Sequence, residues 1–400
     1  MSQALPLSEA THGDRVATQR RSLGGACLAH ALHDGYTDLL YVLLPVWQAE
    51  FGLSYAGVAA LRSLYYGTMG GLQMPADRLA GRLSIRAALA LSTLVAAAGF
   101  VVMGLGNGLV GLCAGLVIAG IGSSLQHPRA SLLVSDAYGR AARGPLGLYN
   151  FAGDLGKATF PAAVALLLGV LAWRPVAGLM ALAGLAAAVA LVAVLPSRPL
   201  APAQARAAGS GAGTPRNFAL LMGVGALDTA TRMGTLLFLP FLLEAKGGSD
   251  ATTGLALALV FGGGAFGKAL CGWLGERVGV VRSVIATEIL TALLVAALLP
   301  LPLGPTLALL PLLGIALNGT SSVLYGTVPD LAPRGDTAQA FALFYTAVIG
   351  SGGLAPIAYG AFADRMGETA GLLAAAATAL ATVPPVLMLR RPLKAAQARV

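Results

Sequence analysis

The chain has 400 residues, of which 56% are hydrophobic and 11% are charged, and its formal net charge is +9. Soluble domains carry about 25% charged residues, so this composition excludes an ordinary soluble protein and indicates a chain surrounded mostly by lipid. The positive charge does not indicate a nucleic-acid partner, because the Lys and Arg residues stand at the ends of apolar stretches, where membrane topology accounts for them. The three cysteines show neither disulfide nor metal-ligand spacing.

A polar tail at residues 1–22 opens the chain, and it lacks the apolar core and cleavage site of a signal peptide. Twelve apolar stretches follow, each near the ~20 residues that cross a hydrocarbon core of ~30 Å. The sequence therefore predicts an all-α membrane protein. The twelve transmembrane helices are predicted at residues 23–47, 54–75, 84–106, 109–130, 146–171, 175–195, 217–243, 251–274, 281–301, 306–328, 337–361 and 369–389.

The segment at residues 197–216 is rich in Ala, Gly, Pro and Arg and has no apolar periodicity, which predicts a flexible cytoplasmic linker. It separates two six-helix bundles at residues 23–196 and 217–389, and a second tail follows at 390–400. The bundles resemble each other, since the Leu-Tyr pair at 148–149 precedes a proline by the same interval as the Leu-Phe pair at 343–344. Two pseudo-symmetric halves are typical of transporters, which bind their substrate between the halves.

The distribution of basic residues predicts the orientation. If the amino terminus is cytoplasmic, most of the 26 Lys and Arg residues fall in cytoplasmic segments, and only Arg174, Lys246 and Arg365 fall in loops on the other side. Positive loops stay in the cytoplasm. Both termini are therefore expected in the cytoplasm, and the chain is expected to be a multi-pass protein of the cell inner membrane.

Short motifs that place an acid beside an arginine follow the second, eighth and eleventh stretches. Such a pair at a helix end can bridge neighbouring helices and hold one conformation closed. A histidine that precedes a proline stands near the cytoplasmic end of the fourth stretch. The predicted gate residues are Asp77, Arg78, Arg82, Glu276, Arg277, Asp364, Arg365 and His127.

The motifs after the second and eighth stretches resemble the G-x-x-x-D-R-x-G-R signature of the major facilitator superfamily. Within it, the chain is similar to the fosmidomycin-resistance-like drug exporters, on residues 29–54, 120–128 and 148–161, with a weaker match at 350–367. The resemblance implies a twelve-helix fold and proton-coupled export by alternating access. The chain departs from this group at Asp38, Asp154 and Lys157, which leaves its substrate open.

Ionisable residues inside the predicted helices are costly in lipid and are functional by default. His30, Asp34 and Asp38 follow one another at helical i, i+4 spacing and share a stripe, with His33 about one residue away from it. An acid that is paired in one state and protonated in another can couple proton movement to conformational change. Asp34 with His30 or His33 is the first candidate for the proton-coupling site, and Asp38 or Asp154 is the second.

Further charges are spaced as pairs. Asp154 and Lys157 are three residues apart, and Asp228 and Arg232 are four apart, so each is predicted to form an ion pair within its helix. The alternative is that these pairs only neutralise one another and tie helices together. Lys268 and Glu288, closer to helix ends, are expected to extend toward the membrane surface or anchor loops.

Fixed positive charges in the same presumed cavity indicate an anionic or zwitterionic substrate, because guanidinium and ammonium groups bind carboxylate or phosphonate. Several tyrosines could line the pocket, although a buried tyrosine is as often a packing residue. The candidate substrate-binding residues are Arg62, Lys157, Arg232, Asp228, Tyr65, Tyr66, Tyr149 and Tyr345.

The sequence leaves other functions open. His30, His33, Asp34 and Asp38 could bind a divalent metal ion for transport, although the nearby cations would repel it; proton-coupled uptake of an organic anion is a second alternative. A membrane enzyme or a receptor is disfavoured, because no P-loop, HExxH motif or nucleophile–His–acid set is present. We expect a monomer that needs a small-molecule substrate, a bilayer and a proton gradient, with no resident metal, cofactor or nucleic acid.

Overall fold

The computed structural model describes residues 12–196, 213–333 and 337–397, which form helices and no strand. The helices of the amino-terminal half are α1 (His12–Phe51), α2 (Tyr55–Leu79), α3 (Ile85–Leu105), α4 (Gly108–Ser123), α5 (Gln126–Tyr138), α6 (Arg143–Leu168) and α7 (Trp173–Val194). Those of the carboxy-terminal half are α8 (Pro215–Ala245), α9 (Asp250–Val278), α10 (Val280–Leu298), α11 (Leu303–Leu331), α12 (Thr337–Met366), α13 (Glu368–Ala381), α14 (Val383–Met388) and α15 (Arg390–Gln397).

Each of the twelve apolar stretches falls on one helix or on two consecutive helices. The fourth covers α4 and the start of α5, and the twelfth covers α13 and α14, where two consecutive prolines begin the second helix. Two ends differ from the prediction. α1 begins at His12, inside the stretch predicted as a polar tail, and α15 occupies most of the predicted carboxy-terminal tail. The linker at 197–216 lies outside the described residues up to position 212.

Ten helical segments of the described chain are long and apolar enough to cross a membrane, counting α4–α5 and α13–α14 as one segment each. α1 and α2 are not among these ten. These two helices carry charged residues near their middle, including Asp34, Asp38 and Arg62, which lower their mean hydropathy. The protein therefore spans the membrane several times, and the count of twelve stays a prediction that depends on α1 and α2.

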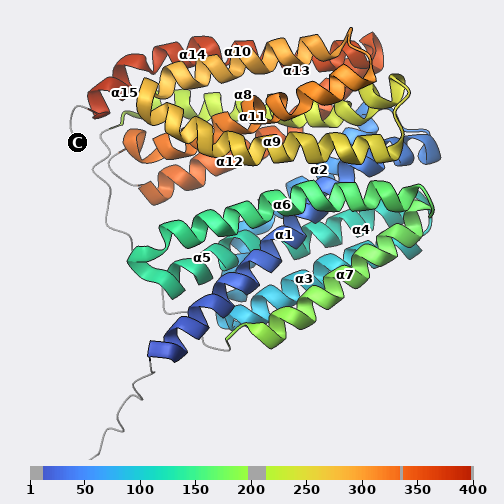
Figure 1. Ribbon diagram of the computed structural model, residues 1–400, viewed down its shortest axis with the longest axis vertical. Coiled ribbons are helices and arrows are strands. Elements are labelled where there is room, and N and C mark those ends of the chain that lie inside the picture. Colours follow the sequence, from blue (N-terminus) through green and yellow to red (C-terminus); the bar gives the residue numbers. More distant parts are fainter. Residues whose placement is uncertain (1–11, 197–212, 334–336, 398–400) are drawn as a thin grey trace, which may run out of the picture.

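The helices form two bundles, with α1 to α7 in one and α8 to α15 in the other (Figure 1). The start of α1 and the end of α15 lie on one side of the molecule, called here the termini side. The bundles meet where α2 packs on α12 and α6 packs on α9. Glycines allow close approach inside each bundle, as where Gly156 of α6 lies against the backbone of Ala31 in α1.

α1 and α8 pass through the middle of the protein. From Ala29 to Leu44 every residue of α1 except Ala31 is buried, and so is nearly all of α8 between Asp228 and Leu243. The apolar residues of both segments share one core, which includes Leu39, Leu44, Leu237 and Phe238. The polar residues of these two segments are thus enclosed by protein rather than by lipid.

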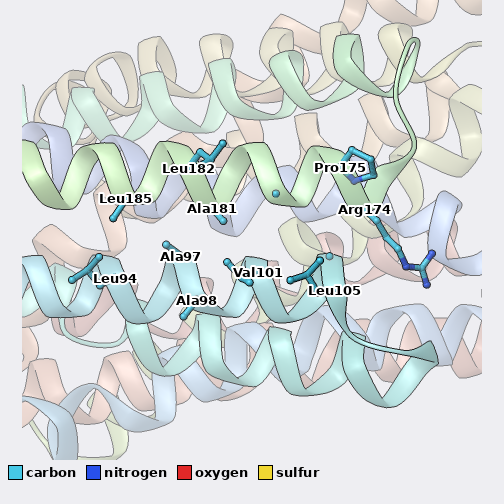
Figure 2. Close-up of a pocket in the computed structure, with 12 residues that line it drawn as sticks. Leu94, Ala97, Ala98, Val101, Leu105, Arg174, Pro175, Ala181, Leu182 and Leu185 are labelled. Carbon is cyan, nitrogen blue, oxygen red and sulfur yellow. The ribbon is translucent and has the colours of Figure 1, made fainter.

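A groove of about 600 Å³ lies between α3 and α7, and its walls are apolar (Figure 2). Leu94, Val101, Leu182 and Leu185 line it, and Arg174 at one end is its only ionisable lining residue. Because the groove offers no acid or base pair, it does not supply the chemistry of a coupled transporter.

Candidate functional site

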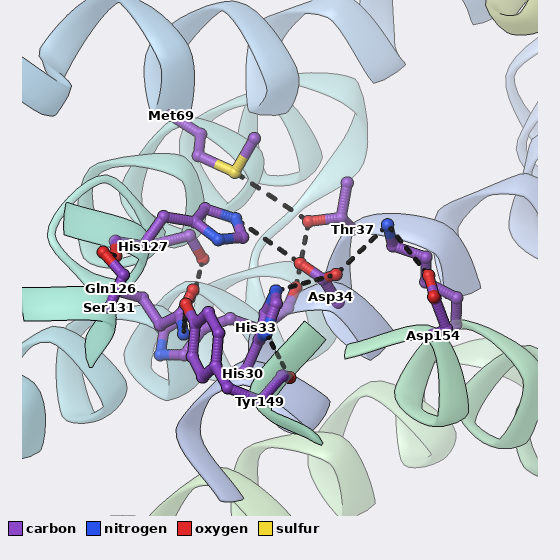
Figure 3. A network of polar contacts seen from close by, with 12 residues as sticks. His30, His33, Asp34, Thr37, Met69, Gln126, His127, Ser131, Tyr149 and Asp154 are labelled. Carbon is purple, nitrogen blue, oxygen red and sulfur yellow. Dashed lines mark hydrogen bonds and ion pairs between the residues drawn. The ribbon is translucent and has the colours of Figure 1, made fainter. Parts of the chain in front are cut away.

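The strongest concentration of charge surrounds Asp34, at the centre of α1 (Figure 3). One carboxylate oxygen, Oδ2, lies 3.2 Å from His30 Nε2 and 3.1 Å from Lys157 Nζ. The other, Oδ1, lies 3.4 Å from Nε2 of His127. Asp34 and His30 are buried, and His127 is about one third exposed. Three basic side chains from α1, α5 and α6 thus converge on one carboxyl group.

The contacts of His30 suggest that the His30–Asp34 pair holds one proton more than a neutral imidazole and an ionised carboxylate carry together. Its Nδ1 lies 2.8 Å from the carbonyl oxygen of Tyr149, which can only accept, so Nδ1 must carry a hydrogen. In neutral imidazole the other nitrogen, Nε2, is then an acceptor, yet it faces a carboxylate oxygen of Asp34. Two acceptors do not attract each other, so a proton between His30 and Asp34 would make this contact favourable.

Gly153 of α6 lets this contact form. A Cβ atom at this position would lie 2.7 Å from Asp34 Oδ2 and 2.7 Å from His30 Nε2, closer than side-chain atoms normally approach. On the same helix, Gly147 has open space where a Cβ would stand. Nothing in the sequence distinguishes Gly153, because the chain has 53 glycines and α6 alone carries several.

Lys157 and Asp154 connect Asp34 to the opposite half. Lys157 Nζ lies 4.0 Å from Asp154 Oδ1, which confirms the predicted pair, but the closer contact of Asp154 is Lys268 Nζ of α9 at 2.5 Å. The prediction that Lys268 extends toward the membrane surface was wrong, because a carboxylate across the interface attracts its ammonium group. Asp34, Lys157, Asp154 and Lys268 form a chain of alternating charges from one bundle to the other.

His33 belongs to a separate, neutral cluster. Its Nδ1 lies 2.9 Å from Ser123 Oγ and its Nε2 lies 3.1 Å from Thr93 Oγ1. Tyr65, predicted to line the substrate site, pairs with the same Ser123 hydroxyl at 2.7 Å. These bonds tie α1 to α3 and α4 and engage the side chains of His33 and Tyr65, neither of which makes a hydrogen bond or ion pair with the Asp34 carboxylate among the described residues.

Arg62 of α2 is almost completely enclosed, with 1% of its surface exposed. Its guanidinium carbon lies 4.6 Å from the ring centre of Tyr41 and 4.7 Å from that of Tyr66. None of its three nitrogens has a hydrogen-bond partner among the described residues. Asp38, one turn of α1 beyond Asp34, is buried and interacts electrostatically with Arg62 and Lys157. Cation–π contacts stabilise the Arg62 charge while its donors stay available.

Asp228 does not form the ion pair predicted from its spacing to Arg232. Its Oδ2 accepts a hydrogen bond of 2.9 Å from Ser321 of α11, and its carboxyl group hydrogen-bonds that of Glu288 in α10. No oxygen of Asp228 lies within 4.0 Å of Arg232 in the described chain. Glu288, predicted to anchor a loop, is 2% exposed. Both predictions failed because helix packing brings these carboxyl groups together from positions 60 residues apart.

The two remaining candidate tyrosines, Tyr149 and Tyr345, lie in different surroundings. Tyr149 stacks on His30 with 4.0 Å between ring centres, and its hydroxyl accepts a hydrogen bond from Gln126. Tyr345 is about half exposed and stacks against Tyr325, with ring centres 5.1 Å apart. Tyr149 is therefore part of the Asp34 site, whereas Tyr345 is not in contact with it.

The predicted gate residues on the termini side contact partners other than the neighbouring residues of their sequence motifs. Asp77 accepts from Arg129 of α5, at 2.5 Å, rather than from its neighbour Arg78. Arg277 stacks over Trp273 at 5.5 Å. The structure does not describe the side chains of Arg82 and Glu276. His127, predicted as a gate residue, contacts Asp34 instead.

On the side opposite the termini, Asp364 of α12 joins the two halves. Its carboxylate accepts hydrogen bonds from the backbone nitrogens of Tyr55 at 2.6 Å and Ala56 at 3.2 Å, at the start of α2. The Tyr55 hydroxyl also lies 2.9 Å from Glu368. A carboxylate at a helix amino terminus satisfies free N–H groups and matches the helix dipole. No ion pair is seen for the adjacent Arg365 within the described residues.

A metal site remains an alternative at the same place. His30, Asp34 and His127 each offer a ligand atom, and these three atoms lie within 4.8 Å of one another. The set differs from the predicted one, since His33 and Asp38 are not in it. Lys157, however, holds its ammonium group 3.1 Å from the same carboxylate. A divalent cation would have to displace it.

Two separate matches to one family model cover residues 26–223 and 220–399, so each half carries the pattern of the Major Facilitator Superfamily. The chain belongs to this superfamily. Its fold is that of transporters that move small solutes across membranes by secondary active transport. The repeated match agrees with the division into two bundles. No curated protein matched in the sequence search.

Solved structures of the superfamily share the fold over nearly the whole chain. A POT family transporter in complex with 5-aminolevulinic acid superposes with a TM-score of 0.75 at 13% identity, over 93% of this chain and 96% of that one. A peptide transporter POT mutant in complex with alafosfalin gives 0.74 at 14%, over 94% and 95%. A bacterial homolog of human Spinster in an inward-facing, occupied conformation gives 0.68 at 18%, over 95% and 97%.

Proposed function

We propose that this protein is a proton-coupled transporter of a small organic anion or zwitterion, and that it exports its substrate in exchange for protons. The observation that carries the proposal is the contact between the buried His30 and Asp34 side chains, whose geometry favours a proton between the two groups. Histidine changes charge near neutral pH. A proton held there can be exchanged as the cavity opens to one side or the other.

The route from this proton to the conformational change runs through Lys157. When the His30–Asp34 pair is protonated, the carboxyl of Asp34 attracts the Lys157 ammonium less strongly, and that ammonium can shift toward Asp154, 4.0 Å away. A stronger Lys157–Asp154 pair competes with the contact between Asp154 and Lys268. Because Lys268 belongs to the other bundle, proton uptake in one half changes the attraction between the halves.

Arg62 supports the anionic character of the substrate. Its guanidinium is buried and its donors are unpaired within the described residues, so a carboxylate, phosphonate or phosphate oxygen would satisfy them. Lys157 and Arg232 add positive charge around Asp38, with which both interact electrostatically. The solved relatives crystallised with 5-aminolevulinic acid, alafosfalin and sulfate show that this fold accommodates such ligands in other proteins.

The sequence supports the proposed orientation and direction of transport. The excess of Lys and Arg on the termini side supports cytoplasmic termini and a place in the inner membrane. The similarity of the first, fourth and fifth helices to the fosmidomycin-resistance-like group supports export rather than uptake.

Transport into proteoliposomes under an imposed pH gradient tests the proposal. The panel contains phosphonates, amino acids, organic acids and divalent metal ions, each measured with the lumen acidic and with the medium acidic. An exchanger accumulates its substrate when the lumen is acidic, because protons leave as substrate enters. Accumulation driven by an acidic medium would show uptake with protons instead. Movement of metal ions alone, or no response to the gradient, would contradict the proposal.

A further inference from the structure

We propose that Asp228 and Glu288 share one proton and form a second protonation site, located in the carboxy-terminal half and separate from the Asp34 site. The two carboxyl groups come from α8 and α10 and lie close enough to interact directly. Two ionised carboxylates have only acceptor oxygens, so a direct contact between them is favourable only with a proton on one of the two groups.

Burial makes the shared proton obligatory rather than optional. Asp228 is 4% exposed and Glu288 is 2% exposed. Two carboxylate charges in contact, removed from water, repel each other far more strongly than at a surface. No Lys, Arg or His nitrogen lies within 4.0 Å of either carboxyl group in the described parts of the chain. With no cation close enough to offset both charges, one group stays neutral.

The polar surroundings indicate which group holds the proton. Asp228 accepts a hydrogen bond from Ser321 at 2.9 Å, and Arg232 lies one turn farther along α8. Both favour the ionised form of Asp228. Glu288 keeps one buried oxygen, Oε2, without any partner among the described residues. We therefore place the proton on Glu288, with its hydroxyl donating to Asp228. Arg232 and Tyr325 of α11 are the other ionisable groups that face Asp228.

The amino-terminal half has a corresponding cluster around His33, and this cluster connects the equivalent helices without a pair of carboxyl groups. His33 and Asp228 are 195 residues apart, as are Thr93 and Glu288. In the amino-terminal half His33 bonds Thr93 and Ser123, so that neutral side chains tie its first, third and fourth helices. In the carboxy-terminal half Asp228 makes the equivalent bonds to Glu288 and Ser321. The acid pair thus makes the same structural connection and adds a titratable proton.

Infrared spectroscopy of the full-length protein in lipid vesicles tests this site without any transport. Wild type should show the carbonyl stretch of a protonated carboxylic acid at neutral pH. Glu288→Gln should lose the component of this band that comes from the pair, because the carboxamide replaces the neutral carboxyl while keeping a donor for Asp228. Asp34→Asn, the matched control from the other half, should keep that component. Thermal unfolding of each variant confirms that it is folded.

Asp228→Asn provides a second measurement. An amide in this position leaves Glu288 without a charged neighbour, so Glu288 should stay protonated and its band should shift in frequency. The proposal is overturned if wild type lacks the band, or if neither substitution at the pair changes it. It is also overturned if sodium or potassium ions remove the band at constant pH, since the pair would then hold a metal ion. Because the band is read at equilibrium, failure of the proposed transport would leave this result unaffected.

Discussion

Arg62 is the residue whose surroundings differ most from those of an ordinary buried arginine. Its charge lies between two tyrosine rings, and its donors have no acceptor in the described protein. An arginine that stabilised the fold would be expected to hold a carboxylate or carbonyl. We interpret Arg62 as a binding group for the oxyanion of the substrate.

Replacement of Arg62 should therefore weaken substrate binding more than it weakens folding. A charge-assisted contact contributes about 1.5–3 kcal/mol, so Arg62→Gln should lower affinity by roughly tenfold or more, at ~1.4 kcal/mol per decade. Arg62→Lys should recover part of the affinity, because it restores the charge but not the planar fork. Equilibrium binding to the purified variants measures both effects. Equal affinity in wild type and both variants would make Arg62 a structural residue.

The sequence located the important residues better than it located their partners. Ionisable side chains stand out in apolar helices, so Asp34, Asp154 and Asp228 could be singled out from the chain alone. Helical spacing then predicted partners on the same helix. In the structure the closest partners of Asp154 and Asp228 come from other helices, because the packing of bundles decides which faces meet.

At the scale of helices, α6 approaches α1 closely enough to cover the His30–Asp34 contact because positions 153 and 156 are both glycine. The approach is a property of the pair of helices rather than of either residue. Apolar stretches predicted α6 within a few residues but placed the start of α1 eleven residues too late, and nothing in the pattern distinguished Gly153 from other glycines.

Gly153→Ala should displace α6 from α1 and impair proton-coupled transport. The added methyl group would lie 2.7 Å from atoms of both Asp34 and His30, so one of these side chains must move. Gly147→Ala, on the same helix, is the control, since its methyl group meets no atom within 4 Å. Proton-driven transport rates of the two variants are compared at equal protein content. Equal rates would show that the close approach has no role in coupling.

Asp154 and Lys268 allow the electrostatic contact between α6 and α9 to be measured. Lys268→Gln leaves the buried Asp154 carboxylate with only Lys157, 4.0 Å away. Asp154→Asn leaves Lys268, which is about one third exposed, without its partner, so each change should lower the unfolding temperature. If the contact is only structural, the double variant should regain both stability and transport. We expect it to regain stability without transport, because Asp154 also competes for Lys157. Unfolding temperatures and transport of the three variants separate the two outcomes, and full activity in the double variant would contradict ours.

Glu50 connects the end of α1 to the start of α7 at the opposite side from the termini. It accepts a hydrogen bond from Trp173 and lies 2.7 Å from Arg174. Partial burial alone would raise the pKa of Glu50, but the donors of Trp173 and Arg174 outweigh it and lower the pKa. Because its pKa is lowered in the folded protein, Glu50 stabilises the fold at pH values above the pKa of the unfolded state, about 4.3. This contribution is lost as the pH falls through the pKa of the folded state.

Glu50→Gln should therefore lower the unfolding temperature slightly at neutral pH, because the pair is partly exposed and such pairs contribute about 1 kcal/mol or less. The difference from wild type should shrink in acid, below about pH 4. Thermal unfolding as a function of pH measures it. A difference that stays constant into acid would assign the effect to packing rather than to charge.

For the whole molecule, the division into two similar halves was predictable and the contacts between them were not. Hydropathy, the linker and the repeated prolines indicate two bundles, and each bundle matches the same family model. The interface depends on which faces of α2, α6, α9 and α12 meet, and those faces carry no distinct pattern in the sequence. The chain of charges from Asp34 to Lys268 is therefore visible only in the folded protein.

The central claim is that the proton at Asp34 drives movement of substrate across both halves. Asp34→Asn keeps the shape of the side chain but cannot exchange a proton. Two assays on the same proteoliposomes separate its effects: accumulation against a gradient under an imposed pH difference, and exchange of labelled for unlabelled substrate with no pH difference. We predict that the variant loses accumulation and retains exchange. Accumulation at the wild-type level in Asp34→Asn would contradict the account.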